Sequence, residues 1–239
     1  MIEIDDLTVQ FGGVRGLSTL TASLPAPVTG LVGPNGAGKT TLINVLSGFV
    51  RPTIGRVMVD GEDLENIAIH KRAAFGIRRT FQNEQVVENL TAGENVAAVL
   101  DNVPTDGRPR RELIEAALEF VGLAAKRNVP GHSLNAYQRR MLEIARATVG
   151  RPRLVMMDEP GAGLAQHESE HLRHIIKEMH GYCGAQVLLV DHDVDLISAT
   201  CTATLVLDFG SAIAYGPTQD VLADPKVRAA YLGVLEETT

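Results

Sequence analysis

The chain of 239 residues has little cysteine, since Cys183 and Cys201 are its only two. They have neither CxxC spacing nor a matching pair of histidines, which excludes a zinc finger and a disulfide scaffold. Two reduced cysteines are typical of a cytosolic protein. A block rich in lysine and arginine is also missing, and the formal net charge is -7. Nucleic acid is therefore not expected as a partner.

Long apolar runs are absent as well. No stretch approaches the roughly 18 apolar residues that a membrane-spanning helix needs. The first ten residues, MIEIDDLTVQ, read as a strand and lack the basic and apolar regions of a signal peptide. If the protein works at a membrane, we expect another chain to anchor it there.

The remaining pattern is that of an α/β protein. Residues 2–9, 17–23, 28–32 and 55–59 are predicted strands, and residues 39–48 a helix. LVMM at 154–157 and QVLLV at 186–190 are continuous apolar runs, typical of parallel strands covered on both faces. The middle of the chain is mostly helical. The simplest organisation is one α/β domain over residues 1–239 with a helical subdomain, residues 83–149, inserted into it.

A phosphate-binding loop is predicted where GPNGAGKTT follows an expected strand and begins an expected helix. The pattern G-x-x-x-x-G-K-[ST] runs from Gly33 to Thr40. Glycine lets the backbone bend around phosphates, and the helix N-terminus attracts anions. We expect Lys39 to contact the β- and γ-phosphates and the Thr40 hydroxyl to hold Mg²⁺. The predicted nucleotide-binding residues of this loop are Gly33, Pro34, Asn35, Gly36, Ala37, Gly38, Lys39, Thr40 and Thr41. The alternative is a glycine-rich turn with an exposed lysine.

Acidic and histidine side chains follow the two apolar strands. Asp158, at the end of LVMMD, is a candidate Mg²⁺ ligand. Glu159 is expected to point the other way, because neighbouring strand residues face opposite sides, and to act as general base. His192, after VLLVD, should emerge at the same sheet edge and contact the γ-phosphate and the attacking water. The alternatives are a strand that happens to end in two acids and an ordinary surface histidine.

These motifs together resemble the nucleotide-binding subunit of an ABC transporter, over nearly the whole chain except about residues 101–111. The resemblance implies an α/β P-loop NTPase fold, with a RecA-like core, an antiparallel β subdomain and an inserted α-helical subdomain. IRRTFQN (77–83) is similar to the Q-loop, which makes Gln82 the residue that senses Mg²⁺ and the membrane partner. Phe11 in VQFGG matches the aromatic that stacks on adenine. The implied catalytic residues are Glu159, His192, Lys39 and Gln82, and the implied Mg²⁺ ligands are Thr40, Gln82 and Asp158.

A narrower resemblance, to the ATPases of branched-chain amino acid importers with the urea and amide importers close by, depends on RTFQN, NLTAGENV, SGFVRPTIGRVMVDGEDL, LEIARA and YLG. It implies ATP and Mg²⁺ as cofactors. It also implies a second ABC ATPase subunit, membrane permeases and, indirectly, a solute-binding protein as partners. The expected location is cytoplasmic, at the inner face of the cell membrane through the permeases.

LNAYQ (134–138) stands where the family has a signature such as LSGGQ, whose backbone faces the ATP of the opposite subunit. Asn135 replaces serine, and Tyr137 replaces a glycine that allows close approach. Ala165 replaces a polar residue of the D-loop. One hypothesis is an asymmetric heterodimer, in which this chain's own loop hydrolyses ATP and the opposite site turns over poorly. The alternatives are that Tyr137 points away and both sites work, or that the domain binds nucleotide with little hydrolysis.

HESEH (167–171) fits the zinc-protease pattern H-E-x-x-H, with His174 following on the same helical face. The remote alternative is a zinc hydrolase with Glu168 as its base. We expect a solvated helix face instead, because the segment follows the Asp158 strand, where the family carries variable charged residues. A further alternative is an ABC ATPase of DNA repair or translation. Those proteins have long coiled-coil or tandem-cassette chains, and this chain has neither feature.

Overall fold

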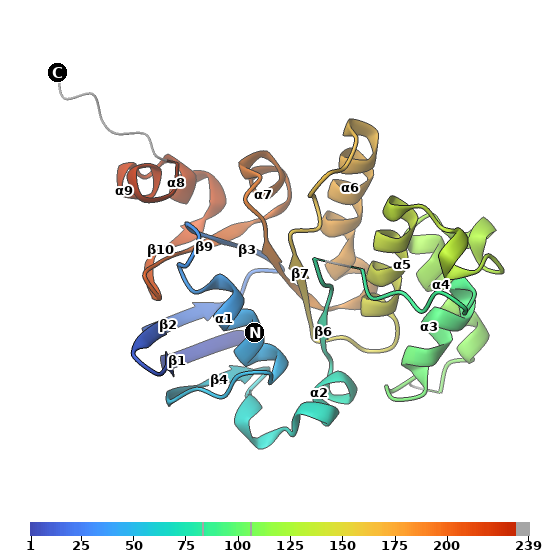
Figure 1. The fold of residues 1–239 in the computed structure, drawn as a ribbon, viewed down its shortest axis with the longest axis horizontal. Helices are drawn as coiled ribbons and strands as arrows, with labels where there is room; N and C mark the ends of the chain where they lie inside the picture. Colours follow the sequence, from blue (N-terminus) through green and yellow to red (C-terminus); the bar gives the residue numbers. More distant parts are fainter. Residues whose placement is uncertain (83, 106, 233–239) are drawn as a thin grey trace. The chain divides into compact units, whose positions relative to one another are not determined.

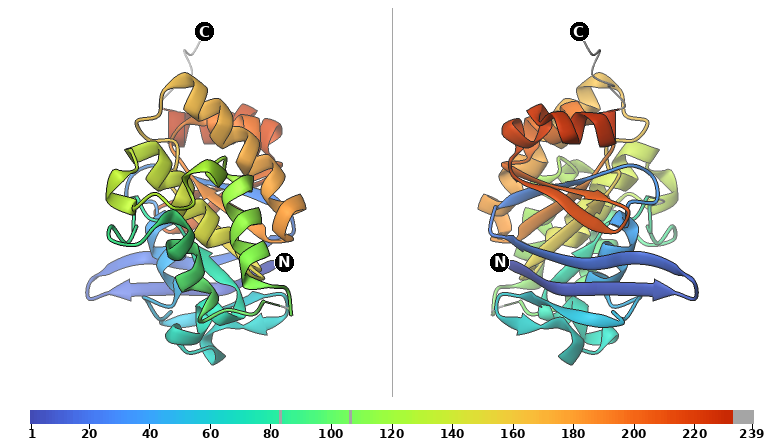
Figure 2. Two further views of the ribbon diagram at one scale, coloured as in Figure 1. Left: turned by 90° about the vertical axis from the view of Figure 1, so that its right-hand side faces the viewer. Right: turned by 90° about the vertical axis from the view of Figure 1, so that its left-hand side faces the viewer.

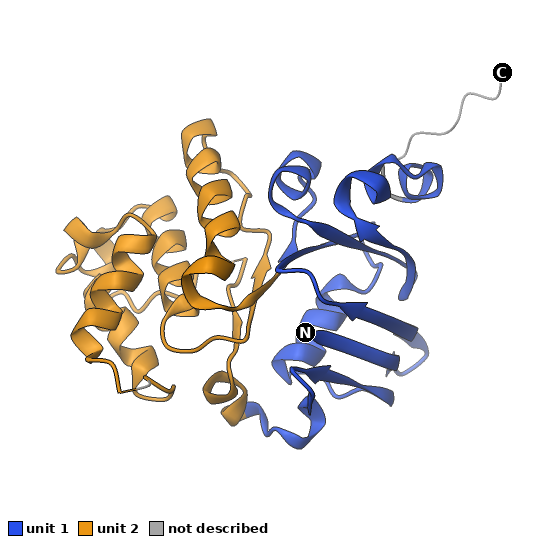
Figure 3. Ribbon diagram, turned by 180° about the vertical axis from the view of Figure 1, so that it is seen from behind, with its two compact units in different colours: residues 1–69, 188–239 blue, residues 70–187 orange. Residues whose placement is uncertain are grey.

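The computed structural model describes residues 1–82, 84–105 and 107–232 (Figure 1). It divides into two compact units (Figure 3). Unit 1 comprises Met1–Ile69 and the chain from Leu188 onward, and unit 2 comprises His70–Val187. The chain thus leaves unit 1 once and returns to it.

Unit 1 begins with an antiparallel sheet in the order β2-β1-β4-β5. Its strands are β1 (Ile2–Phe11), β2 (Val14–Leu24), β4 (Ile54–Val59) and the short β5 (Glu62–Asp63). In β1 the apolar side chains of Ile2, Ile4, Leu7 and Val9 are buried while residues between them are more exposed. That near-alternation explains why one face of the sheet is covered. The antiparallel subdomain predicted from the resemblance is present.

A second group of strands in unit 1 has the order β10-β9-β3. β3 (Val28–Val32) runs parallel to β9 (Ala203–Asp208), which pairs antiparallel with β10 (Ser211–Pro217). All five residues of β3 are buried, as the continuous apolar pattern predicts. β8 (Gln186–Val190) contains the boundary between the units. The helices of this unit are α1 (Lys39–Ser47), α7 (Val194–Thr200), α8 (Thr218–Ala223) and α9 (Pro225–Val227), with short turns at Leu64–Asn66 and Arg228–Leu232.

Unit 2 holds most of the helices. α3 (Ala92–Leu100), α4 (Arg110–Phe120) and α5 (Ala136–Thr148) pack against one another, and Figure 2 shows them side by side in green and yellow-green. α6 (Gln166–Cys183) contacts α5. β6 (Ile77–Arg79) runs parallel to β7 (Leu154–Asp158), and α2 (Ile69–Phe75) precedes them. Short 3₁₀ turns lie at Ala124–Lys126 and Gly131–Ser133.

Two helices of this unit begin with a capping box. Thr91 and Glu94 form a capping box at α3, in which each side chain accepts from the other's backbone N–H. Asn135 and Gln138 do the same at α5. Within the described part of the chain, no helix is both long and apolar enough to cross a membrane.

Asn95 is a polar side chain inside the helical group, with no exposed surface. Its Oδ1 accepts from Val87 N at 2.9 Å, and its Nδ2 donates to the carbonyls of Val87, Leu90 and Thr91 at 3.0, 3.2 and 3.1 Å. A buried polar group is tolerated only when its partners are supplied, and here they fasten the 87–91 segment onto α3.

We expect Asn95→Leu to lower the free energy of unfolding by about 2–4 kcal/mol, because it leaves backbone groups buried without partners. The exposed Asn102 of the same unit gives a matched control. Asn102→Leu should change stability by less than about 0.5 kcal/mol. Denaturant unfolding of both variants tests this, and equal losses would contradict the assigned role of Asn95.

Candidate functional site

The phosphate-type loop of unit 1 connects β3 to α1 and has the backbone that its glycines predict. Gly33, Gly36 and Gly38 have φ angles of +150°, +83° and +104°. At Gly33 a Cβ would lie 2.2 Å from Leu207 O, and at Gly38 it would lie 2.5 Å from Gly16 O. Backbone of β9 and β2 therefore leaves no room for a side chain at these two positions.

The loop is further held by the turn between β9 and β10. Gly210 N donates to Ala37 O at 3.0 Å, and Ser18 N donates to Gly210 O at 2.8 Å. Lys39 begins α1, and its Nζ donates to Gly33 O at 2.6 Å and Pro34 O at 3.0 Å. The ammonium group is thus held over the loop whose N–H groups an anion would contact.

Phe11 lies beside the same loop. Its ring is half exposed at the end of β1. A Cβ on Gly16 would lie 2.8 Å from Phe11 Cε2 and 3.0 Å from Thr41 Oγ1, so the ring and the Thr41 hydroxyl both flank Gly16. An exposed aromatic next to a phosphate-type loop is a suitable platform for a flat base, as the resemblance implies.

The histidine after β8 is at the surface of unit 1. The His192 side chain is 70% exposed, and its Nδ1 lies 3.8 Å from Asp191 Oδ1. Asp191 is buried and accepts from Asp193 N at 2.9 Å, while Asp193 caps α7. The fold therefore fixes the backbone on both sides of His192 and leaves the imidazole accessible.

In unit 2 the carboxylate at the end of β7 has a partner that the sequence reasoning missed. Arg79, the last residue of β6, donates through Nη2 to Asp158 Oδ2 at 2.9 Å, and both side chains are largely buried. Arg79 also lies over the ring of Phe81, 5.0 Å from its centroid. The signal was present in RRT, because a basic residue on a strand parallel to LVMMD is placed to meet the acid that ends it.

Glu159 and Gln82, both predicted catalytic residues, are in contact. Gln82 Nε2 donates to Glu159 Oε2 at 2.9 Å. The expected reason for the orientation of Glu159 was wrong, however. β7 ends at Asp158, and Glu159 has φ +51°, so strand alternation does not apply to it. A non-glycine residue in this region is strained, and such strain is found mostly where a side chain must be aimed.

LNAYQ forms a normal helix start. The Asn135 side chain accepts from Gln138 N at 2.8 Å, and Gln138 Oε1 accepts from Asn135 N at 3.2 Å. The Tyr137 hydroxyl hydrogen-bonds His171 Nδ1 on α6, and burial raises the pKa of Tyr137 to about 12. The phenol is therefore directed toward a helix of its own unit.

The stretch after Glu159 is attached to α5. Arg140 Nη1 donates to Pro160 O at 2.8 Å and Ala162 O at 2.7 Å. A cavity of about 260 Å³ lies between these segments. It is lined by Arg140, by residues of LNAYQ and by residues of the predicted D-loop stretch EPGAGLAQHE (159–168): Asn135, Ala136, Tyr137, Arg140, Ala162, Gly163, Leu164 and Glu168. Ala165 is the N-cap residue just before α6, and its N–H donates to Glu168 Oε2 at 3.0 Å.

Those contacts do not support the zinc alternative. Glu168 is engaged in starting α6, and His171 is engaged with Tyr137. Among the described residues, no three His, Cys, Asp or Glu side chains gather closely enough to hold a metal ion.

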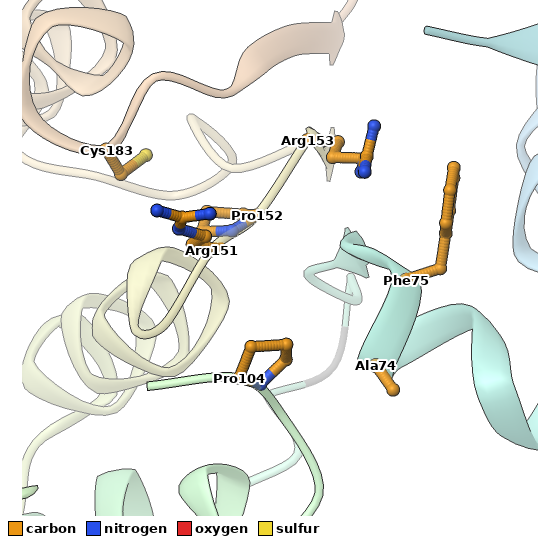
Figure 4. A pocket seen from close by; sticks show the side chains of 7 residues that line it. All are labelled: Ala74, Phe75, Pro104, Arg151, Pro152, Arg153 and Cys183. Atoms are coloured by element: carbon orange, nitrogen blue, oxygen red, sulfur yellow. The ribbon is translucent and has the colours of Figure 1, made fainter. Parts of the chain in front are cut away.

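A larger cavity of unit 2, about 530 Å³, contains none of the predicted site residues (Figure 4). Its most distinctive contact is Arg153 over the ring of Phe75, at 4.5 Å from the centroid. The lining residues are Ala74, Phe75, Pro104, Arg151, Pro152, Arg153 and Cys183.

Comparison with known proteins agrees with this geometry. The family model "ABC transporter" matches residues 20–162. The chain belongs to the ABC transporter ATP-binding family. A second model, "Branched-chain amino acid ATP-binding cassette transporter", matches residues 213–236 of this ABC ATPase.

Individual relatives cover nearly the full length of the chain. The high-affinity branched-chain amino acid transport ATP-binding protein BraF of Pseudomonas aeruginosa is 36% identical, over 98% of each chain. The lipopolysaccharide export system ATP-binding protein LptB of Acidithiobacillus ferridurans is also 36% identical, over 92% of this chain and 90% of its own. Among solved structures, the ADP conformation of MJ1267, an ATP-binding cassette of an ABC transporter, has a TM-score of 0.83 at 29% identity and covers 98% of this chain and 99% of its own.

The predicted Mg²⁺ ligands each carry a side-chain oxygen. In unit 1 the Thr40 hydroxyl lies in the first turn of α1, and in unit 2 the Asp158 carboxylate ends β7. Gln82 donates to Glu159 through its side-chain nitrogen, so its side-chain oxygen is the atom that could bind a cation. Oxygen donors of these three kinds are the ones Mg²⁺ takes in proteins.

Glu143 on α5 is the second residue that the sequence reasoning missed. It is 4% exposed, and its Oε1 accepts from Phe81 N at 3.2 Å and Gln85 N at 3.3 Å. Burial raises the pKa of Glu143 to about 7. An acidic residue within the apolar helix sequence LEIARA was the available signal, since a buried carboxyl needs donors.

We expect Gly38→Ala to weaken MgATP binding by about 100-fold or more, or about 2.7 kcal/mol, because the added carbon meets Gly16 O. Gly181 of α6 has no atom within 4 Å of an added Cβ, so Gly181→Ala is the matched control and should leave binding unchanged. Titration calorimetry measures both. Unchanged affinity in the Gly38 variant would exclude the loop as the phosphate site.

Proposed function

We propose that this ABC ATPase hydrolyses ATP to drive the import of branched-chain or related amino acids. Urea and amides are the nearest alternative solutes. The observation that carries the catalytic part is the Gln82–Glu159 contact at 2.9 Å. It brings a metal- and partner-sensing amide to the carboxylate assigned as general base. A domain that only binds nucleotide needs neither group, so the contact favours hydrolysis over the binding-only alternative.

The proposed roles follow the chemistry of phosphoryl transfer. Thr40, Asp158 and Gln82 would hold Mg²⁺, which would supply charge neutralisation at the phosphates. The loop amides and Lys39 bind the triphosphate, and Phe11 stacks on the base. Glu159 orients or deprotonates the attacking water, and His192 stabilises charge on the transferred group.

The amino-acid assignment is supported by BraF and by the model match at residues 213–236. LptB is equally identical but covers less of the chain, so lipopolysaccharide export is the second candidate. We propose that the partners are a second ATPase subunit, membrane permeases and, indirectly, a solute-binding protein. The chain would then lie at the cytoplasmic face of the membrane. Uptake of labelled leucine by a strain that lacks this gene decides between the two substrates.

We expect Glu159→Gln to lower ATP turnover at least about 100-fold, because a carboxamide cannot take a proton from water. Affinity for MgATP should be kept, and an ATP-bound dimer should accumulate in size-exclusion chromatography. Glu178→Gln, at an exposed position of α6, is the matched control and should turn over normally. Retained turnover in the Glu159 variant would remove its assigned role.

The asymmetric heterodimer remains a hypothesis, and its support has shifted. Tyr137 contacts His171, so a phenol blocking the opposite ATP is no longer the argument. Asn135 and Ala165 now carry it, because the Asn135 oxygen is used to start α5 and Ala165 has no polar group. Ala165 lacks a hydrogen-bonding side chain at the subunit interface, and Asn135 offers the partner's ATP an amide nitrogen in place of the serine hydroxyl.

The Walker lysines of the two subunits test the asymmetry. In a heterodimer, Lys39→Ala in this chain should abolish most turnover, whereas the same change in the partner's loop should reduce it by less than about twofold. Turnover measured in the reconstituted complex gives the ratio. Equal losses from the two variants would show that both sites hydrolyse ATP.

A further inference from the structure

Three charged side chains of α5 point from one helix face to the segment around Gln82. Arg140, Glu143 and Arg146 are spaced by three residues, which places them on neighbouring turns of the same side. Arg140 Nη2 donates to Glu84 Oε1 at 3.1 Å, and the Arg146 guanidinium donates to Gln85 O. Of the three, Glu143 is the most deeply buried.

Glu143 holds the segment at two points. One carboxylate oxygen, Oε1, accepts both from Phe81 N and from Gln85 N. Phe81 precedes Gln82 in the chain and Gln85 follows it. The regular structure of β6 ends at Arg79, and Thr80 N adds one further bond to Met156 O at 2.9 Å. The backbone on either side of Gln82 is thus fixed by a side chain of a different element.

The same helix is attached to the segment that follows Glu159. Arg140 binds the carbonyls of Pro160 and Ala162. α5 therefore contacts both segments whose side chains meet in the Gln82–Glu159 hydrogen bond, and it begins in LNAYQ, the stretch assigned to the opposite ATP.

We propose that Glu143 is a positioning residue for hydrolysis: it sets Gln82 against Glu159 and ties that contact to the position of α5. The proposal rests on the proposed function, since it gives Gln82 and Glu159 their roles in ATP turnover. Contacts that α5 makes at its LNAYQ end would then affect the catalytic carboxylate through a rigid helix. Glu143 acts through Gln82 and touches no reacting atom.

Two variants of the same size separate the hydrogen-bonding role from packing. Glu143→Leu removes the acceptor, and Glu143→Gln keeps an oxygen at the same place. In Glu143→Leu we expect the amides of Phe81 and Gln85 to exchange hydrogen at least about tenfold faster, because their partner is gone. Glu143→Gln should exchange within about twofold of the parent chain. Hydrogen–deuterium exchange of the full chain measures this without nucleotide.

Kinetics then test the role in turnover. Glu143→Leu should lower kcat about tenfold with KM for MgATP changed less than about twofold, because the phosphate loop is untouched. Glu143→Gln should restore kcat. A rise in KM at constant kcat, or equal losses in both variants, would overturn the positioning role.

A double-mutant cycle shows whether Glu143 acts through Gln82. In a Gln82→Ala background, Glu143→Leu should lower kcat by less than about twofold, since the group it positions is missing. The same tenfold loss in both backgrounds would overturn the proposal and indicate a general structural effect. A Gln82→Ala variant with normal kcat would overturn it too.

Glu159→Gln, assayed alongside, separates this proposal from the proposed function. If that variant loses turnover while Glu143→Leu does not, only the positioning role fails. If Glu159→Gln retains turnover, the catalytic assignment itself fails. Should Glu143→Leu not fold, as judged by circular dichroism, Glu143→Asp withdraws the carboxylate by one methylene group. The Glu143→Asp variant should show faster hydrogen exchange at the amides of Phe81 and Gln85 and a lower kcat. Exchange rates and kcat equal to those of the parent chain would overturn the proposal.

Discussion

Backbone crowding around the phosphate loop is the constraint on which the rest of unit 1 depends. The loop has left-handed conformations, and at Gly33 and Gly38 carbonyl oxygens of Leu207 and Gly16 occupy the space of a side chain. Those oxygens belong to β9 and β2, so the loop has its shape only when both strands are in place. The Gly210 bonds to Ala37 and Ser18 add a third support. An anion site made of main-chain N–H groups needs such rigid support, because the groups must not turn away when no anion is present.

The parts of the fold that follow from local pattern were predictable. The span of β3, residues 28–32, matches the structure residue for residue, because an apolar run between turns is determined within the segment. The phosphate loop, Gln82 and Glu159 were predicted as site residues, and the contact between Gln82 and Glu159 was found only in the structure. Arg79 and Glu143 were missed because their roles depend on partners 79 and 62 residues away in sequence. The extent of the inserted subdomain, residues 83–149, stays a prediction.

LNAYQ shows how local and long-range requirements separate. A capping box places an acceptor side chain at the N-cap residue and a second acceptor side chain three residues later. Asn135 and Gln138 of α5 provide these two groups. A family signature that approaches a phosphate of another subunit has a glycine where this chain has the bulky Tyr137, while Asn135 keeps an amide donor where the family has serine. The hydrogen bond between the Tyr137 hydroxyl and His171 indicates that the bulky residue is accommodated within its own unit. The stretch therefore keeps its structural function even where its side chains depart from the family.

The hydrogen bonds that attach α5 to the segment after Glu159 and to the segment around Gln82 differ in length. The bonds from Arg140 to Pro160 and Ala162 are 2.8 and 2.7 Å long and charge-assisted, so this segment is held firmly. The bonds from Phe81 and Gln85 to Glu143 are 3.2 and 3.3 Å long, near the outer limit for N–H donors. Arg140 and Arg146 add charge-assisted bonds to Glu84 and to Gln85 O, so a displacement of α5 would carry both segments with it and would first lengthen the two bonds that Glu143 accepts. The Gln82–Glu159 hydrogen bond joins the two segments that α5 holds, so its geometry depends on the position of the helix.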